Sequence, residues 1–397
     1  HDMTFDTTSR LGKPARPVTV PNARTPAFDL DTVYGDGPAG SPPLYDPNDR
    51  IKFNVQSGGL FEDLPRDGNK VALIGDPRND ENMMIAGLHA AFLIFHNNAV
   101  DLIRSRKPSI ANDEAFRQAR RLTTWHYHWM ILHEFLPLFV GQAMVDEILA
   151  HGRKFYTPFK DRAFIPVEFQ IGYRFGHSMV RPSYRANLAG DNSQPFFGMI
   201  FDPSQQGTPD PNDLRGGARA PRRFIGWQTF FDFGDGALRP NKKIDTKIST
   251  PLFNLPLQAI PAGDPPTSLV QRNLLRHLTF LLPSGQAIAA RIGAPVLSDT
   301  ELAELESIRP SFKTSTPLWY YILKEAELME EGLHLGPVGG RIVGEVFIGL
   351  LQTDPKSYLN VQPHWIPTLP TKTGNPKDFR MIDFLTFAGV DPASRGQ

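Results

Sequence analysis

Apolar residues recur at steps of three and four along much of the chain, which is the spacing that lines one face of a helix. The longest such stretch covers residues 82–104 and is apolar around so much of its circumference that we expect it to be buried. A second long helix is predicted over residues 113–139 and a third over 142–151. The same spacing returns in the C-terminal half, over residues 268–282, 299–308, 317–331, 338–351 and 378–387.

The segments between these helices have the composition of long loops. Residues 1–70 and 183–265 are rich in Pro, Gly, Asp and Asn, with only short helices expected around residues 223–231. No series of alternating apolar and polar residues predicts a sheet, and no fixed-period repeat or heptad pattern is present. The sequence therefore predicts a mainly α fold, one large domain over residues 1–397, with long ordered loops and very little strand.

The charged residues balance, with 42 Lys and Arg against 42 Asp and Glu. No net field therefore attracts nucleic acid or a charged membrane surface. Cys is absent, which excludes disulfides, thiolate metal sites and a cysteine nucleophile. No uninterrupted apolar run reaches the roughly 18 residues of a transmembrane helix. Because the sequence starts at His1 without an initiator Met, we expect a fragment or a processed product that lacks a portion upstream.

One histidine stands out by its surroundings. His177 lies in the stretch Gly172–Pro182, after an apolar run, with Gly176 and Ser178 beside it. A neutral imidazole with an apolar wall around it suits an axial metal ligand. The alternative is a histidine that is simply hydrogen-bonded in a core.

An arginine stands where a helix start disfavours it. Asp80 or Asn79 is expected to cap the helix that follows, and the acids around them suit its positive end. Arg78 is a cation in the same place and opposes the helix dipole. Its position predicts that Arg78 faces an anion or a site where negative charge develops.

Oxygen-bearing side chains alternate in the segment 25–35. Thr25, Asp29 and Asp31 can let one loop wrap a hard cation such as calcium, and an ordinary acidic turn is the alternative. Three further histidines, His126, His128 and His133, do not form a comparable site. Their spacings do not stack on one helical face, and His133-Glu134 lacks the second histidine of the HExxH zinc motif. Helical packing is the better interpretation for them.

Five separated motifs follow one another in one order: HDMTFD from His1, DLDTVYG from Asp29, GDPRNDEN from Gly75, residues 87–99, and FGHS from Phe175. They resemble the DHDxxF, DxSxVYG, GDxRxxEN, HTLxxREHNRLA and GH[ST] motifs of the animal-type haem peroxidases of the peroxidase-cyclooxygenase superfamily. The resemblance extends along nearly the whole chain. Residues 316–321 and 335–343 are similar to bacterial branches of that family.

The resemblance implies a haem b cofactor and a role for each matching residue. His177 would bind the iron, and Arg174 and Arg272 would pair with the haem propionates. On the opposite side of the haem, His1 would move a proton between the oxygens of hydrogen peroxide. Arg78 would stabilise the charge on the departing oxygen. Glu81 stands where some members form an ester to the haem, and helix capping is its alternative role.

The resemblance also implies a calcium ion held by Asp2, Thr25, Ala27 through its carbonyl, Asp29 and Asp31. Such an ion beside His1 would fix the distal imidazole without taking part in redox chemistry. The proximal side departs from the family pattern, because Leu269 stands where the family has the Asn that bonds the proximal histidine. The sequence therefore does not name the group that orients His177, although Asn273, one turn further along, is a candidate.

Three functions follow as alternatives. The first is a haem peroxidase that reduces hydrogen peroxide, as in a response to oxidative stress, and oxidises a small organic donor or a halide. The second is a haem-dependent fatty-acid dioxygenase of the cyclooxygenase branch, although Tyr173 lies four residues before His177 and that branch has its tyrosine three before. The third is a non-catalytic haem-binding or adhesion module, or an inactive fragment. The family resemblance favours a secreted, extracellular protein, and we expect no nucleic-acid partner.

Overall fold

The computed structural model describes residues 3–6, 8–57, 61–158, 162–190, 193–260 and 263–392, so His1 and Asp2 lie outside the described residues. Helices account for 46% of the structure and strands for 5%, which confirms the predicted fold class. The strands in this part of the chain pair as two separate antiparallel ribbons. These are β1 (Gln56–Ser57) with β2 (Glu62–Asp63), and β3 (Ser183–Arg185) with β4 (Phe197–Met199).

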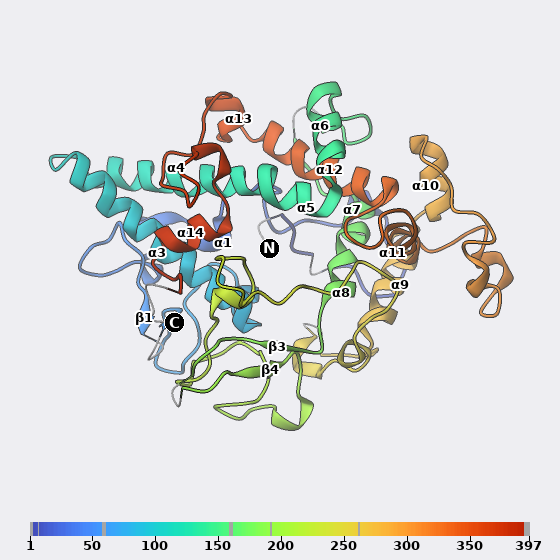
Figure 1. Cartoon of the computed structure of the whole chain (residues 1–397), viewed down its shortest axis with the longest axis horizontal. Coiled ribbons are helices and arrows are strands. Elements are labelled where there is room, and N and C mark those ends of the chain that lie inside the picture. The colour runs from blue at the N-terminus through green and yellow to red at the C-terminus, as the bar shows by residue number, and fades with distance from the viewer. Residues whose placement is uncertain are drawn as a thin grey trace.

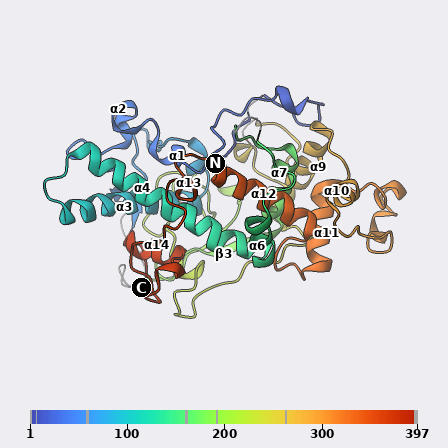
Figure 2. The same cartoon turned by 90° about the horizontal axis from the view of Figure 1, so that it is seen from above.

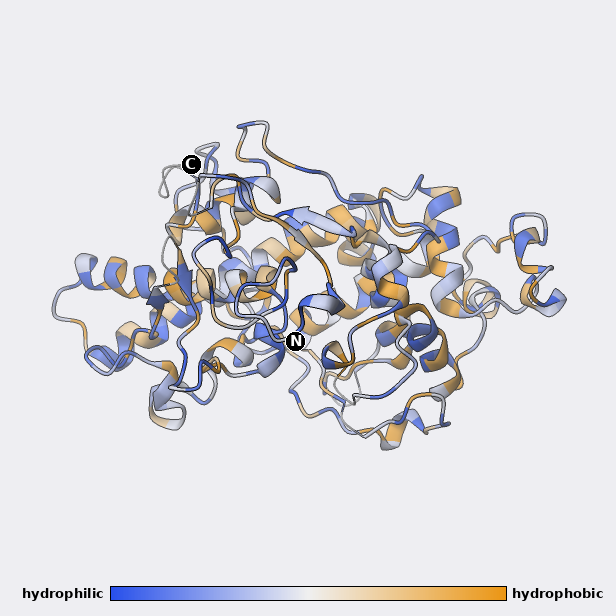
Figure 3. Cartoon of the chain, turned by 90° about the horizontal axis from the view of Figure 1, so that it is seen from below, coloured by the Kyte–Doolittle hydropathy of each residue, from blue (hydrophilic) through white to orange (hydrophobic). Residues whose placement is uncertain are grey.

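Two long helices form one half of the molecule (Figure 1). Helix α3 (Met83–Arg106) packs along α4 (Asn112–Met130), with α1 (Asp31–Tyr34) and α14 (Met381–Phe387) against α3. By length and composition alone α3 could cross a membrane, but most of its apolar stretch is buried in the protein, and buried core helices pass the same test. Figure 3 shows the hydrophobic residues lying largely on the helices.

The helix predicted over residues 113–139 is interrupted. After α4 comes a π-helical turn (Ile131–Phe135), and the chain then continues as α5 (Leu136–Val140). Pro137 has no N–H to donate to the carbonyl of His133, four residues earlier. That carbonyl accepts a hydrogen bond from the Arg380 guanidinium instead. The π turn therefore occurs where the α-helical hydrogen-bond series has to break.

The other half contains helices from the middle and the later part of the chain, as the view from above shows (Figure 2). Helix α12 (Pro337–Thr353) packs on α6 (Gln142–His151), α5, α7 (Val167–Gly172) and α11 (Leu318–Met329). The remaining helices are short: α2 (Gly37–Gly40), α8 (Gly176–Met179), α9 (Leu269–Thr279), α10 (Gly285–Ile292) and α13 (Tyr358–Val361).

Two sequence predictions differ from this half. Residues 299–308 form turns around one 3-10 segment (Ala303–Leu305), because Leu302 and Leu305 alone are buried there and give no helical stripe. Helix α10 was not predicted. Its two ends are capped. The Ser284 side chain accepts a hydrogen bond from the Ala287 N–H, and Gly293 ends the helix in a left-handed conformation at φ 73°.

Candidate functional site

His177 lies on the short helix α8. Helix α7 passes through a 3-10 turn (Tyr173–Phe175) into α8, which carries His177 and ends at Met179, three residues before Pro182. The neighbouring helix α9 brings Asn273, which is fully buried, against the ring. Asn273 Nδ2 lies 2.8 Å from His177 Nδ1. The candidate named from the sequence is therefore the residue that contacts the imidazole.

Arg174 completes a chain of contacts through the same amide. Its Nη1 donates to Asn273 Oδ1 at 3.1 Å, and its Nε donates to the carbonyl of Gln170 at 2.9 Å. Within the part of the chain that the structure describes, no carboxylate forms an ion pair with Arg174. Burial, and then the charges of Arg276 and Arg272, lower the pKa of Arg174 to about 10. A buried guanidinium in this situation lacks the anion that would normally offset its desolvation.

Burial also controls the protonation of His177. Loss of water around the ring, followed by the nearby charge of Arg174, lowers the pKa of His177 to about 3. The imidazole is therefore neutral at physiological pH and keeps a lone pair for a metal. Neutral His177, Asn273 and an arginine without a counterion together suit a metal cofactor that carries acidic groups.

The two arginines of α9, Arg272 and Arg276, bond groups other than this amide. Arg272 Nη1 donates to the carbonyls of Asp264 and Pro266, both at 3.0 Å. Arg276 Nη1 donates to the Ser9 carbonyl at 3.3 Å. Both nevertheless lie close enough to Arg174 to lower its pKa, so the three guanidinium groups form one positive region. Sequence reasoning named Arg174 and Arg272 and missed Arg276, which one helical turn separates from Arg272.

Arg78 lies in a 3-10 turn (Pro77–Asp80) that precedes α3, and it has an acidic partner close by. Asp76 accepts from Arg78 Nε at 2.9 Å and from Nη2 at 2.7 Å, and the Thr4 carbonyl accepts from Nη1 at 2.8 Å. Burial acts to raise the pKa of Asp76, but hydrogen bonds from Arg78 and Arg24 outweigh it and hold that pKa at about 2. The charge that seemed unbalanced at this helix start is thus balanced by Asp76. The anion expected opposite Arg78 is, in this structure, Asp76.

The capping prediction for α3 is wrong in its residues. The Asn82 side chain caps the helix by accepting from the Met84 N–H. Asp80 instead pairs with Arg66 at 2.7 Å, and Asn79 contacts His89. The helix begins at Met83, close to the predicted start, and Asp76 instead caps a separate 3-10 turn (Pro77–Asp80).

Glu81 lies between that turn and α3. It is exposed, yet the surrounding protein removes enough water from its carboxyl to raise the pKa, against the opposing charge of Arg78. Ile85, one helical turn further, is 41% exposed. Glu81 and Ile85 are therefore both exposed near the N-terminal end of α3.

The N-terminal segment connects Arg78 with α9. Thr4 accepts from Arg78, and Ser9 accepts from Arg276. Gly12 then donates to Thr279 Oγ1 at 2.8 Å. Five residues of extended chain span at most about 18 Å, so the groups at the start of α3 and those on α9 belong to one region of the molecule.

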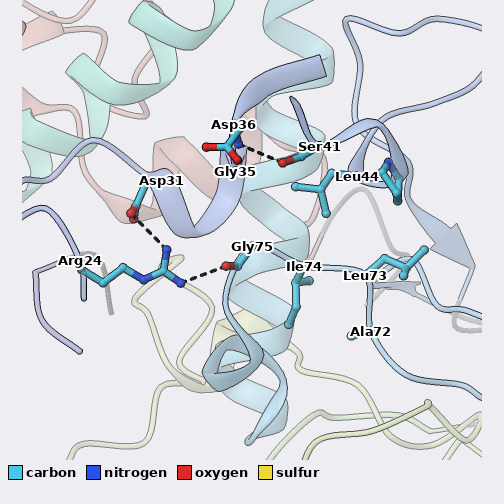
Figure 4. A pocket seen from close by; sticks show the side chains of 11 residues that line it. Arg24, Asp31, Gly35, Asp36, Ser41, Leu44, Ala72, Leu73, Ile74 and Gly75 are labelled. Carbon is cyan, nitrogen blue, oxygen red and sulfur yellow. Dashed lines mark hydrogen bonds and ion pairs between the residues drawn. The ribbon is translucent and has the colours of Figure 1, made fainter. Parts of the chain in front are cut away.

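Asp31 of the predicted calcium loop pairs with an arginine, Arg24, which also donates to the Gly75 carbonyl (Figure 4). Arg24 Nη1 lies 3.2 Å from Asp31 Oδ2, and the Asp31 N–H donates to Asp29 Oδ1 at 3.2 Å. Asp31 Oδ1 is buried and has no hydrogen-bond partner in the described structure. A search of the same residues finds no group of three His, Asp or Glu side chains placed to hold a metal. Thr25, Ala27, Asp29 and Asp31 thus offer one unsatisfied carboxylate oxygen, while Asp2 lies outside the described residues.

The three histidines near α4 are held by hydrogen bonds. His126 Nδ1 contacts the Leu122 carbonyl at 2.7 Å, and His128 Nε2 contacts the Phe28 carbonyl at 2.8 Å. His133 Nε2 lies 3.2 Å from the Tyr358 hydroxyl. The three rings face different partners, as their spacing predicted.

Comparisons with known proteins agree with the motifs. The sequence model described as animal haem peroxidase matches residues 3–212. Chorion peroxidase of Aedes aegypti is 26% identical over 387 residues, which cover 91% of this chain and 45% of that protein. The chain spans less than half the length of the curated relatives it matches.

Two solved structures share the fold. Peroxidase A of Dictyostelium discoideum superposes with a TM-score of 0.57 and 16% identity, over 85% of this chain and 65% of that one. Fatty acid alpha-dioxygenase of Arabidopsis thaliana superposes with a TM-score of 0.57 and 13% identity, over 93% of this chain and 59% of that one. Since the family model covers more than half of the sequence, this chain belongs to the animal haem peroxidase family.

Proposed function

We propose that this chain binds haem b and reduces hydrogen peroxide, with a small organic molecule or a halide as electron donor. The observation that carries the proposal is the contact chain His177–Asn273–Arg174, which offers a neutral imidazole beside an arginine that pairs with no carboxylate among the described residues. Haem, when bound, supplies the iron redox chemistry that peroxide reduction needs. An extracellular location, which the family resemblance favours, belongs to the same proposal.

The residues of the proximal side have defined tasks in this proposal. His177 would hold the iron through Nε2, which leaves a proton on Nδ1 to be donated. Asn273 must then turn its oxygen toward His177, although in this structure that oxygen accepts from Arg174. Arg174 and His177 therefore compete for one acceptor. The competition ends if Arg174, with Arg272, binds the acidic groups of the cofactor and releases the amide.

The residues of the distal side move charge and a proton. Arg78 would donate to the departing oxygen of peroxide and stabilise the charge that develops there. Its bidentate bond to Asp76 and its contact over the Phe5 ring, 4.5 Å from the centroid, hold the guanidinium in one orientation. His1 would take a proton from one peroxide oxygen and return it to the other.

Glu81 and the 25–31 loop carry two further assignments. Burial of the Glu81 carboxyl raises its pKa, and Glu81 is the residue that would form an ester to the haem. An ester to haem would keep the pigment on the protein through acid-acetone extraction, and Glu81→Gln would release it. Calcium at Thr25, Ala27, Asp29 and Asp31, with Asp2, would satisfy the orphaned Asp31 oxygen.

The absorption spectrum of the haem-loaded protein tests the main proposal. We expect a Soret band that changes on addition of hydrogen peroxide, and loss of the haem in His177→Ala. His334→Ala is the matched control, because His334 contacts Glu330 at the surface of another helix pair and should leave the spectrum unchanged. Full haem retention by His177→Ala would refute the axial assignment. A Soret band that does not respond to peroxide would favour the non-catalytic alternative.

One observation supports a fatty-acid dioxygenase as a second candidate. Tyr173 is close to His177, stacks on Phe169 at 5.1 Å, and burial raises its pKa to about 12. The fold likeness to a fatty acid alpha-dioxygenase over 93% of the chain is compatible with a radical at such a tyrosine. Oxygen uptake with an unsaturated fatty acid, abolished in Tyr173→Phe, would support this function. Absence of uptake by the wild type would exclude it.

A further inference from the structure

Tyr358 and His133 form a buried pair outside the site described above. Tyr358, at the start of α13, is 2% exposed, and its hydroxyl lies 3.2 Å from His133 Nε2. Burial raises the pKa of the phenol, and burial with the nearby Arg380 charge lowers the pKa of His133 to about 4. The imidazole is therefore neutral, and in the tautomer that carries its proton on Nδ1 the ring nitrogen Nε2 accepts the hydrogen bond of the phenol.

Rings that are easily oxidised gather around this pair. Trp129 stacks on His133 with centroids 3.8 Å apart, and Tyr358 lies 6.0 Å from Trp129 and 5.4 Å from Trp365. Trp125 contacts Trp365 at 5.4 Å, so three of the five tryptophans of the chain belong to this cluster. Because the chain has no Cys, indoles and phenols are its most readily oxidised side chains apart from Met.

Contacting rings connect the cluster with the His177 side of the molecule. Tyr173, four residues before His177, begins a series in which each ring lies 5.1 to 6.5 Å from the next. Electrons move readily across such short gaps between neighbouring rings. The series runs through Tyr173, Phe347, Phe28, Tyr127, His128 and Tyr358.

His133 also borders an open cleft of about 390 Å³, which has the size of a small-molecule pocket. Its lining includes Phe231, Leu138, which is 62% exposed, and the charged residues Glu134, Asp232 and Arg380. Two carboxyl groups against one guanidinium suit a neutral or cationic molecule better than an anion. The aromatic and aliphatic walls suit a flat ring.

A second buried tyrosine–histidine pair shows what such a pair looks like without these features. Tyr34 bonds His96 Nδ1 at 2.9 Å, but the other His96 nitrogen bonds the Ile51 carbonyl and the ring is fully buried. The Arg120 guanidinium lies over the Tyr34 ring, 4.6 Å from its centroid. A cation there opposes loss of an electron from Tyr34. No such cation–π contact is found at Tyr358 among the described residues.

We propose that Tyr358 and His133 form a second oxidation site, at which a phenol or an aromatic amine bound in the cleft gives up one electron. The proposal rests on the proposed function, because the reaction of haem with peroxide provides the oxidant. Tyr358 loses one electron to the oxidised haem site, and its hydroxyl proton passes to His133 Nε2. The donor then reduces the tyrosyl oxygen, His133 returns the proton, and the oxidised donor releases its own proton to water. Two such cycles supply the two electrons that convert one hydrogen peroxide, with two protons, to two waters.

Electron paramagnetic resonance on the haem-loaded protein, frozen within milliseconds of peroxide addition, tests the site. We expect a tyrosyl signal in the wild type that falls by at least about tenfold in Tyr358→Phe, and likewise in His133→Gln, whose amide can accept the hydrogen bond but cannot take the proton. Tyr34→Phe is the matched control and should keep the signal. The Soret change caused by peroxide should stay the same in all four proteins. A full tyrosyl signal in Tyr358→Phe, or only a tryptophanyl signal, would overturn the proposal.

An oxidant that does not depend on haem separates this proposal from the proposed function. Photo-oxidised ruthenium tris-bipyridine is an outer-sphere oxidant that removes an electron from a tyrosine without any haem. We expect the same signal, lost in Tyr358→Phe and in His133→Gln and kept in Tyr34→Phe. If peroxide leaves the haem unchanged but this oxidant produces the Tyr358 signal, the peroxidase function fails and the oxidisable pair stands. If neither oxidant yields a signal at Tyr358, the second site is refuted.

Discussion

Asn273 is the residue on which the proximal side depends most directly. Its amide touches His177 at 2.8 Å and Arg174 at 3.1 Å, and it is fully buried. Asn273→Leu keeps the branched shape of the side chain but can make neither contact. With haem bound, the Nδ1–H of His177 is left without an acceptor, which costs about 1–3 kcal/mol. Without haem, it is Arg174 that loses its acceptor, at a similar cost.

One cost destabilises the haem-bound protein and the other destabilises the haem-free protein. The two therefore have opposite effects on the affinity for haem. Loss of a metal ligand's hydrogen-bond partner usually lowers affinity about 10- to 100-fold. We expect Asn273→Leu to lose less than this, because the haem-free protein is destabilised as well. The reduction potential of the iron depends on the haem-bound state alone and is therefore the sharper measurement.

Two variants of Asn273 should shift the reduction potential of the iron in opposite directions. Asn273→Leu removes the acceptor, so the ring donates less electron density and the potential should rise. Asn273→Asp offers a charged acceptor that is stronger by about 1–2 kcal/mol, which corresponds to a fall of about 40–90 mV for a one-electron couple. Spectroelectrochemical titration of the haem-loaded proteins measures both. Asn98→Leu, which removes an amide that bonds the Phe387 carbonyl, is the matched control. Equal potentials in all four proteins would show that Asn273 does not act on the ligand.

Three further predictions concern other parts of the site and the core. Arg78→Ala should keep haem but slow the reaction with peroxide at least about tenfold in stopped-flow measurements, and an unchanged rate would remove Arg78 from the mechanism. Asp31→Asn should weaken calcium binding in isothermal titration, and equal affinity would place any ion elsewhere. Burial lowers the pKa of His96 and of His126 from 6.5 to about 4, so their contribution to stability is complete above pH 6.5 and is lost as the pH falls toward 4. At pH 5.5 the contribution of each histidine to the free energy of unfolding is lower by about 1.4 kcal/mol. Equal urea midpoints at pH 7.5 and 5.5 would contradict this.

Periodicity predicted the long helices well because each buries a continuous apolar stripe. Helix α3 was expected over residues 82–104 and runs from Met83 to Arg106, and α6 has the predicted bounds. The π turn before Pro137 was not predicted, since it depends on a hydrogen bond from Arg380, which is far away in sequence. The short helix α10 was not predicted because local caps at its two ends define it, rather than a long apolar pattern.

The site was predictable where chemistry is local in sequence. Asp76 lies two residues before Arg78, and an N-cap acid followed by an arginine is a pattern that would have suggested the ion pair. The contact between His177 and Asn273 joins residues 96 positions apart, and only the packing of α9 establishes it. Nothing near Tyr358 in sequence predicts its contact with His133, which lies 225 positions earlier in the chain.

The N-terminal segment has a consequence for the order of folding. Ser9 and Gly12 bond residues of α9 that lie 267 positions later in the chain. At typical synthesis rates of about 5–20 residues per second, the partners of this segment emerge from the ribosome roughly 13–53 s after it. The contact that joins Arg78 to the chain start can form early, whereas the contacts on α9 must form late. The region between Arg78 and α9 therefore stays open until residue 279 has been synthesised, an interval in which the proposed haem can enter.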